Sequence, residues 1–141
     1  MPTPPERAGV YEPVKEFGQN FCYLSGFTPI YNGETRWIGK IGRELNIEQG
    51  QEAARICALN LLAHLKKKYG TLDKIKRFVK MLVFVSGTDN FFEQPKVANG
   101  ASQLLVDIFG EEIGQCARSA IGVYTLPGNA PVEIELLVEL N

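Results

Sequence analysis

The last strand-like segment of the chain places the tightest constraint on its fold. From Val132 to Leu140, apolar residues alternate with Glu133, Glu135 and Glu139, and this period of two is that of a β-strand. The apolar row must be buried, while the glutamates lie on the opposite face. The chain therefore has to contain a sheet with one face covered by other elements.

Two amphipathic helices are predicted to provide that cover. Between Gln51 and Tyr69, apolar residues recur at the spacing of one helix face, and Gly70 is suited to end the helix. A second apolar stripe runs from Val97 to Phe109 and stops at Gly110. The run from Lys66 to Lys68 lies in the last turn of the first helix. Cations are favourable at that end of the helix dipole, so we interpret the run as a solvated cap.

The other regular segments are predicted as strands. Val14 to Phe17 and Asn20 to Ser25 are expected to form an opening hairpin, followed by a long loop from Tyr31 to Gly50. The apolar run from Ile75 to Val85 is typical of a central strand that is covered on both faces. The turn from Leu126 to Pro131 is expected to join the last two strands as a hairpin. The resulting fold class is α+β, with a single mixed sheet and two helices packed on one face.

One guanidinium and one carboxylate flank this last turn. Arg118 lies on the strand before it, and Glu133 lies early in the strand after it. Arginine can bind a carboxylate through two parallel hydrogen bonds, and glutamate can accept a hydrogen bond from water or from a leaving amine. On neighbouring strands they would form a carboxylate-binding and water-orienting pair. A structural ion pair is the alternative. Because Ala120 and Gly122 share the Arg118 face and are small, we expect that face to meet another subunit in a homo-oligomer.

Composition narrows the remaining possibilities. The 141 residues, 45% of them hydrophobic, suit one domain over residues 11–141 after a Pro-rich, flexible tail over residues 1–10. A formal net charge of −1 gives no electrostatic support for nucleic-acid binding. The absence of a long apolar run argues against a membrane span and favours a soluble, cytoplasmic protein. The cysteines Cys22, Cys57 and Cys116 are scattered, so neither a disulfide framework nor a metal site is expected.

Three motifs lie in the C-terminal part of the chain, namely Ala117-Arg118-Ser119, Leu126-Pro127 and Val132-Glu133-Ile134-Glu135. In these motifs the chain resembles the signature of the Rid group of enamine and imine deaminases, also called YjgF-like or endoribonuclease L-PSP proteins. Less specific matches are Leu24-Ser25-Gly26 followed by Pro29, Tyr11 near the N-terminus, and Asn99 in the second predicted helix.

The resemblance implies a chorismate-mutase-like fold and a homotrimer with three clefts between subunits. It also implies hydrolytic deamination of small 2-imino or enamine acids, such as 2-aminoacrylate, to 2-oxo acids without metal or organic cofactor. Arg118 would hold the carboxylate of the ligand and Glu133 would position the hydrolytic water. Tyr11, Ser25 and Asn99 would line the pocket, although a turn hydroxyl and a helix residue bonded to a loop are structural alternatives for the last two.

The chain also differs from the family pattern. The segment from Gly9 to Pro13 lacks the glutamine of the usual Gly-Pro-Tyr-x-Gln. Cys116 stands where proline is usual and Tyr124 where a small residue is usual, and both changes would alter the cleft. The long loop from Tyr31 to Gly50, which carries Trp37, resembles a less-characterised branch of the family.

Two functions of other classes stay open. A non-catalytic or chaperone-like trimer that binds small carboxylates fits the same residues. RNA cleavage without a metal usually relies on paired histidines or a comparable acid and base, and His64 is the only histidine. We expect His64 to be a partly exposed helix residue with no catalytic role.

Overall fold

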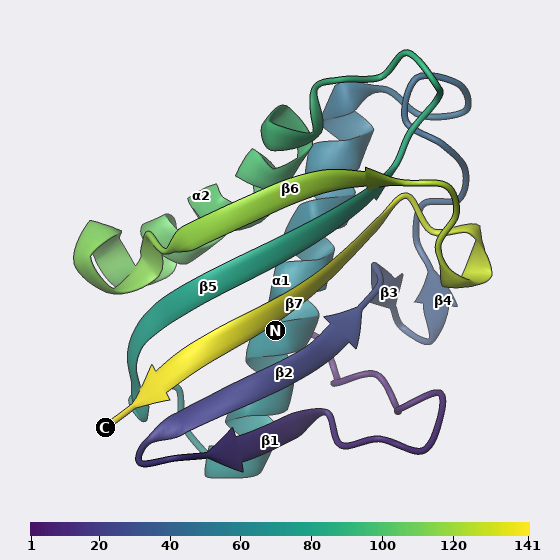
Figure 1. Cartoon of the computed structure of the whole chain (residues 1–141). Helices are drawn as coiled ribbons and strands as arrows, with labels where there is room; N and C mark the ends of the chain where they lie inside the picture. The colour runs from purple at the N-terminus through teal and green to yellow at the C-terminus, as the bar shows by residue number, and fades with distance from the viewer.

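The computed structural model describes all 141 residues and confirms the α+β class, with both helices on one face of a mixed sheet (Figure 1). The sheet has five strands in the order β1-β2-β7-β5-β6, and β3 and β4 form a separate small hairpin. The elements in chain order are β1 (Val14–Phe17), β2 (Phe21–Phe27), β3 (Ile30–Tyr31), β4 (Glu34–Thr35), α1 (Ile47–Tyr69), β5 (Ile75–Ser86), α2 (Gln94–Gly114), β6 (Ala117–Val123) and β7 (Val132–Leu140).

The predicted hairpin between the last two strands is wrong. Strand β5 lies between β6 and β7, and it pairs in parallel with β6 and antiparallel with β7. Phe84 on β5 is therefore opposite both Ile121 on β6 and Glu133 on β7. The connection from β6 to β7 passes over the end of β5, where the Ser86 N–H donates to the carbonyl of Pro131 at 2.8 Å. Helix α2 supplies the crossover that a parallel β5-β6 pair requires.

Helix α1 begins at Ile47 rather than at Gln51. Asn46 caps its N-terminus by accepting a hydrogen bond from the Gln49 N–H at 2.8 Å, and the Gln49 side chain accepts from the Asn46 N–H at 2.9 Å. This capping box satisfies two N–H groups that the first turn would otherwise leave unpaired. The helix ends as predicted at Gly70, whose backbone is left-handed with a φ of 77°.

Helix α2 is longer than its apolar stripe. It starts at Gln94, with Pro95 in its first turn, and continues to Gly114. The predicted stop at Gly110 is instead a break within the helix, where φ is 81°. Gly100 lies where α2 crosses α1, and a Cβ atom there would be 2.0 Å from the backbone oxygen of Gln51. Only glycine lets the two helices pack this closely.

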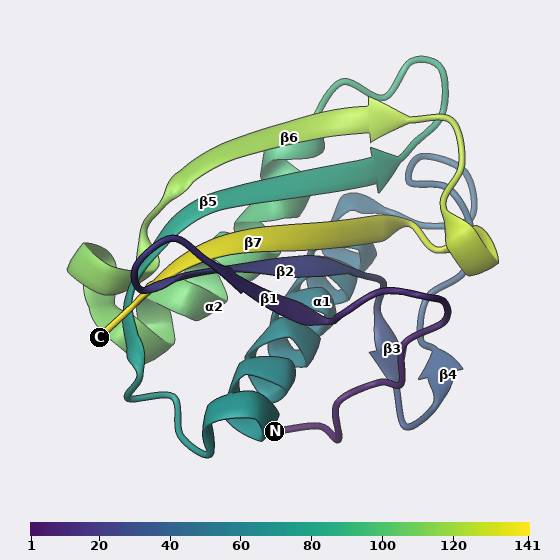
Figure 2. The same cartoon turned by 60° about the horizontal axis from the view of Figure 1, so that its bottom comes forward.

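The alternation along β7 divides the sheet into a buried and an open face. Val132, Ile134, Leu136 and Val138 are fully buried beneath the helices, which lie on one side of the sheet in Figure 2. The opposite face has no cover within this chain, so the expectation that β5 is covered on both faces is not met. It carries half-buried or exposed apolar side chains, namely Phe17, Tyr23, Leu82, Phe84, Ile121 and Leu137.

The segment between β3 and α1 packs across the ends of β5 and β6. The Ile41 N–H donates to the Ser86 carbonyl at 3.0 Å, and the Gly39 N–H donates to the Asn129 carbonyl at 2.9 Å. Lys40 donates to the Ser86 hydroxyl at 3.0 Å and to the backbone of Tyr124. The segment thus supports the loop that connects β6 to β7. Neither helix is both long enough and apolar enough to cross a bilayer.

Candidate functional site

Arg118 lies at the start of β6 and faces α2. Its Nη1 donates to the side-chain oxygen of Asn99 at 2.8 Å and to the hydroxyl of Ser102 at 3.1 Å. No carboxylate of the chain forms an ion pair with this guanidinium. Arg118 and Asn99 line a pocket of about 600 Å³ together with Cys116. The arginine is therefore held in place by neutral partners, and its charge is available to a ligand.

The small residues beside Arg118 face α2 within the chain. Ala120 contacts the hydrophobic core, and a Cβ atom at Gly122 would lie 3.0 Å from Nε2 of Gln94 in α2. Within one chain this face of β6 is thus turned toward α2, and its contact with another subunit stays a prediction. The small side chains bring α2 close to β6, and this packing sets the distance from Asn99 to Arg118.

A second pocket, of about 360 Å³, contains three of the other residues suggested by the sequence. Tyr11, Ser25 and Glu133 line it together with Gly26 and Pro127. A Cβ atom at Gly26 would lie only 2.6 Å from the Oε2 atom of Glu133, so the glycine leaves the space that the carboxylate occupies. No role is predicted for Gly26 or Pro127 from the sequence, although both belong to the matched motifs.

The carboxyl group of Glu133 has an unusual environment. It is half-buried, and burial raises its pKa above the ordinary value, with repulsion from Glu135 as a smaller cause. Glu135 itself accepts a hydrogen bond from the Tyr23 hydroxyl at 3.3 Å. A carboxyl with a raised pKa accepts a proton more readily near neutral pH, which suits a general base.

Tyr11 and Ser25 belong to the wall that closes this second pocket. The Ser25 hydroxyl donates to the carbonyl of Glu12 at 2.6 Å, and the Ala8 N–H donates to the hydroxyl of Tyr11 at 3.1 Å. Arg7 donates to the carbonyl of Tyr11 at 2.7 Å. The bond from Ser25 fastens the N-terminal segment to β2, and the two bonds to Tyr11 hold the turn of the segment itself.

The two pockets lie on opposite faces of the sheet. Arg118 is in register with Met81 on β5, which is fully buried beneath the helices, whereas Glu133 is in register with Phe84 on the open face. Side chains three residues apart on a strand point to opposite faces, and cross-strand partners share a face. The prediction that Arg118 and Glu133 stand on neighbouring strands is wrong, and within one chain they cannot contact the same small ligand.

The residues that depart from the family pattern have different surroundings. Cys116 lines the Arg118 pocket, and burial raises the pKa of its thiol, which makes the thiolate less available. The side chain of Tyr124 is 84% exposed, lies below Lys40, and lines neither pocket. Trp37 packs against the core. His64 is buried rather than partly exposed.

Comparison with known proteins identifies relatives over nearly the whole chain. The model of the family described as YjgF/chorismate mutase-like, putative endoribonuclease matches residues 2–140. Protein TCP17 of Trypanosoma cruzi is 50% identical over 119 residues, which cover 84% of this chain and 74% of that protein.

Two solved structures are also similar. The protein Atu1372 of Agrobacterium tumefaciens, of unknown function, has a TM-score of 0.91 at 41% identity, covering 95% of this chain and 84% of that one. A putative endoribonuclease of Shewanella oneidensis MR-1 has a TM-score of 0.93 at 31% identity, covering 99% of this chain and 91% of the other.

Proposed function

The chain belongs to the YjgF/chorismate mutase-like family, and from this premise we propose that it hydrolyses small 2-imino acids and their enamine tautomers to 2-oxo acids and ammonia. The observation that carries the proposal is the unpaired guanidinium of Arg118. It is half-buried, oriented by Asn99 and Ser102, and lines a pocket that admits a small molecule. An arginine with free donors in such a place matches the carboxylate that every 2-imino acid carries.

Glu133 is proposed to activate the water. The enamine first tautomerises to the imine, and a water that donates a hydrogen bond to the Glu133 carboxylate attacks the imine carbon. The carboxylate takes a proton from the water and passes it to the imine nitrogen, which gives a carbinolamine. It then passes the hydroxyl proton of the carbinolamine to the same nitrogen, and the carbon–nitrogen bond breaks as the carbonyl forms. Ammonia leaves and the 2-oxo acid remains. Because imines hydrolyse in water unaided, general acid-base help of about 10²- to 10⁴-fold is enough.

These roles require at least two chains. We infer that Arg118 with Asn99 from one subunit meets Glu133, Tyr11 and Ser25 from its neighbour, in a homotrimer with three clefts. Two features support this arrangement. The Arg118 pocket and the Glu133 pocket, here called the two half-sites, lie on opposite faces of the sheet, so neither is complete alone. The open face also carries apolar side chains such as Leu82 and Phe84, which another subunit would remove from water.

Measurement of imine hydrolysis tests the proposal. 2-Iminopropanoate is generated in the assay, and the rate of its decay is followed with and without protein. Arg118→Ala loses charge-assisted hydrogen bonds to the carboxylate, so kcat/KM falls by about 10- to 100-fold or more. Arg55→Ala removes an exposed arginine of α1 that lines neither pocket, and this control variant keeps the wild-type rate.

Two results would contradict the proposal. Unchanged hydrolysis by a folded Arg118→Ala protein would remove the arginine from the mechanism. Binding of a 2-oxo acid without any acceleration of imine hydrolysis would leave a carboxylate-binding trimer instead of an enzyme. Ribonuclease activity receives no support from His64, because it is the only histidine and lines neither the Arg118 pocket nor the Glu133 pocket.

A further inference from the structure

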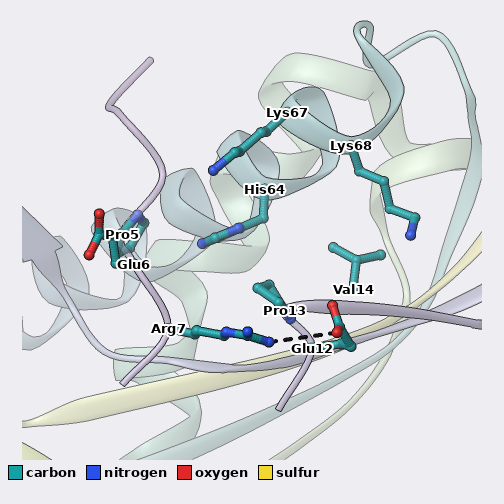
Figure 3. A pocket seen from close by; sticks show the side chains of 9 residues that line it. All are labelled: Pro5, Glu6, Arg7, Glu12, Pro13, Val14, His64, Lys67 and Lys68. Atoms are coloured by element: carbon teal, nitrogen blue, oxygen red, sulfur yellow. Dashed lines mark ion pairs between the residues drawn. The ribbon is translucent and has the colours of Figure 1, made fainter. Parts of the chain in front are cut away.

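A third pocket shares only Glu6 with the Glu133 pocket and no residue with the Arg118 pocket. It has a volume of about 690 Å³ and separates the N-terminal segment from the last turns of α1 (Figure 3). Glu6 and Arg7 line it from the segment, and His64, Lys67 and Lys68 line it from the helix. None of the helix residues contributes to the pockets of Arg118 or Glu133. The proposed deamination therefore makes no use of this space.

His64 indicates that the pocket receives a ligand. Only 6% of the residue is exposed, and its ring stacks on Phe27 with the centroids 4.4 Å apart. Its buried Nε2 atom has no hydrogen-bond partner. Burial is the main cause that lowers the pKa of the His64 ring. The backbone of Pro5 opposes this shift through a hydrogen bond, and the nearby Lys67 lowers the pKa further. A buried polar atom without a partner is rare in proteins, and a bound molecule would supply one.

The charges around His64 favour an anion. Arg7 is paired with Glu12 at 3.6 Å, so these two groups largely neutralise each other. Lys67 and Lys68 form no ion pair or hydrogen bond, and Glu6 is the one carboxylate left to oppose them. In Figure 3, Lys67 and His64 both extend from α1 toward the segment that carries Glu6, while Lys68 extends to the other end of the pocket. The pocket thus holds an excess of positive charge beside a neutral hydrogen-bonding ring.

We propose that this pocket is a second binding site, which takes a small anion with a phosphate or carboxylate group. Lys67 contacts the anion directly, Lys68 adds to the positive potential, and Nε2 of His64 hydrogen-bonds to a polar group of the same ligand. The N-terminal segment forms the opposite wall. Because Glu6 also lines the pocket of Glu133, the segment separates the two sites, and each can be filled without the other.

Titrations at constant ionic strength test this site, with inorganic phosphate and succinate as separate probes. The titrations use Arg118→Ala protein, so that succinate does not bind at the proposed deaminase site. Calorimetry measures affinity, and NMR follows the ring signals of His64, which is the only histidine. Saturable binding of either probe with a shift of the His64 signals supports the site, and the better probe identifies the anion.

Variants distinguish specific binding in the pocket from nonspecific attraction of anions to the lysines of α1. Lys67→Gln weakens binding by about tenfold, as expected for the loss of one charge-assisted hydrogen bond. His64→Phe keeps the stacking on Phe27 but removes Nε2, and it also weakens binding. Lys66→Gln makes the same charge change on the same helical turn, outside the pocket, and is the matched control.

Equal losses in Lys66→Gln and Lys67→Gln would overturn the proposal, as would binding that does not saturate or that leaves the His64 signals unmoved. The NMR measurement needs no variant of the pocket, so it decides the question even if His64→Phe does not fold. Failure of this site would leave the role of Arg118 untouched, because the two pockets share no residue.

Discussion

Complementation between two inactive variants tests the most specific consequence of this structure. Arg118 and Glu133 lie on opposite faces of the sheet, so under the proposed mechanism a complete site takes one residue from each of two chains. Arg118→Ala and Glu133→Gln are each expected to be inactive as homotrimers. A mixed trimer contains one interface in which the intact Arg118 of one variant faces the intact Glu133 of the other.

The recovered activity follows from symmetry. Around a closed ring of three chains, either mixed composition contains one intact cleft, so mixed trimers recover about one third of the wild-type rate per chain. In a two-fold symmetric dimer, one of the two clefts would be intact, and recovery would be about one half. The measurement therefore reports the number of subunits as well as the composition of the site.

The assay uses two affinity tags. Both variants are co-expressed with different tags, mixed assemblies are isolated by successive purification on each tag, and hydrolysis of 2-iminopropanoate is measured. Two differently tagged copies of Arg118→Ala, treated in the same way, give the background. Mixed assemblies that stay at this background would refute the reasoning, because either the site lies within one chain or the two residues do not act together.

Other properties of the pockets give three further predictions. The raised pKa of Glu133 moves the acid limb of the kcat/KM profile to a pH above the ordinary carboxyl value of 4.5, and a limb at or below 4.5 would exclude this group as the base. Gly26→Ala displaces the flexible carboxylate of Glu133, so hydrolysis falls by up to about 10²-fold. The unfolding midpoint of the Gly26→Ala variant hardly changes. Hydrolysis by this variant at the wild-type rate would show that the position of the Glu133 carboxylate is unimportant. The pKa of His64 is lower in the folded chain than in the unfolded chain, where it is about 6.5. The folded state therefore keeps its full stability above about pH 6.5, and protonation of His64 in the unfolded chain reduces the free energy of unfolding as the pH falls below that value. Thermal unfolding at several pH values should therefore show a smaller acid loss in His64→Phe, and equal losses would contradict this assignment.

The sequence predicts the elements of this fold better than their arrangement. The alternation in β7 and the apolar stripes of both helices depend on local spacing, which the chain displays directly. The start of α1 was missed because the Asn46 and Gln49 capping box lies outside the apolar stripe. The position of β5 between β6 and β7 depends on contacts between distant segments. The alternation along a strand shows which of its faces is buried, but it does not show which strands lie beside it.

The candidate site shows the same division. The motifs selected five residues for a single pocket, whereas the structure places Tyr11, Ser25 and Glu133 in one pocket and Asn99 and Arg118 in another. That these pockets lie on different faces followed only from the strand order. The spacing alone indicates that His64 is buried, because it lies one helical turn after the buried Leu61 and next to the buried Leu65. The prediction of a partly exposed residue followed instead from the polarity of the histidine ring.

The position of the two half-sites, back to back across one sheet, has a consequence for how activity would depend on concentration. Under the proposed mechanism, an isolated chain would carry every reacting group and still be inactive, because one small substrate cannot contact both faces of the sheet at once. Under the proposed mechanism, the rate per chain would fall on dilution as subunits dissociate. Under the same proposal, a substitution on the open apolar face that keeps subunits apart would abolish activity as completely as the loss of Arg118.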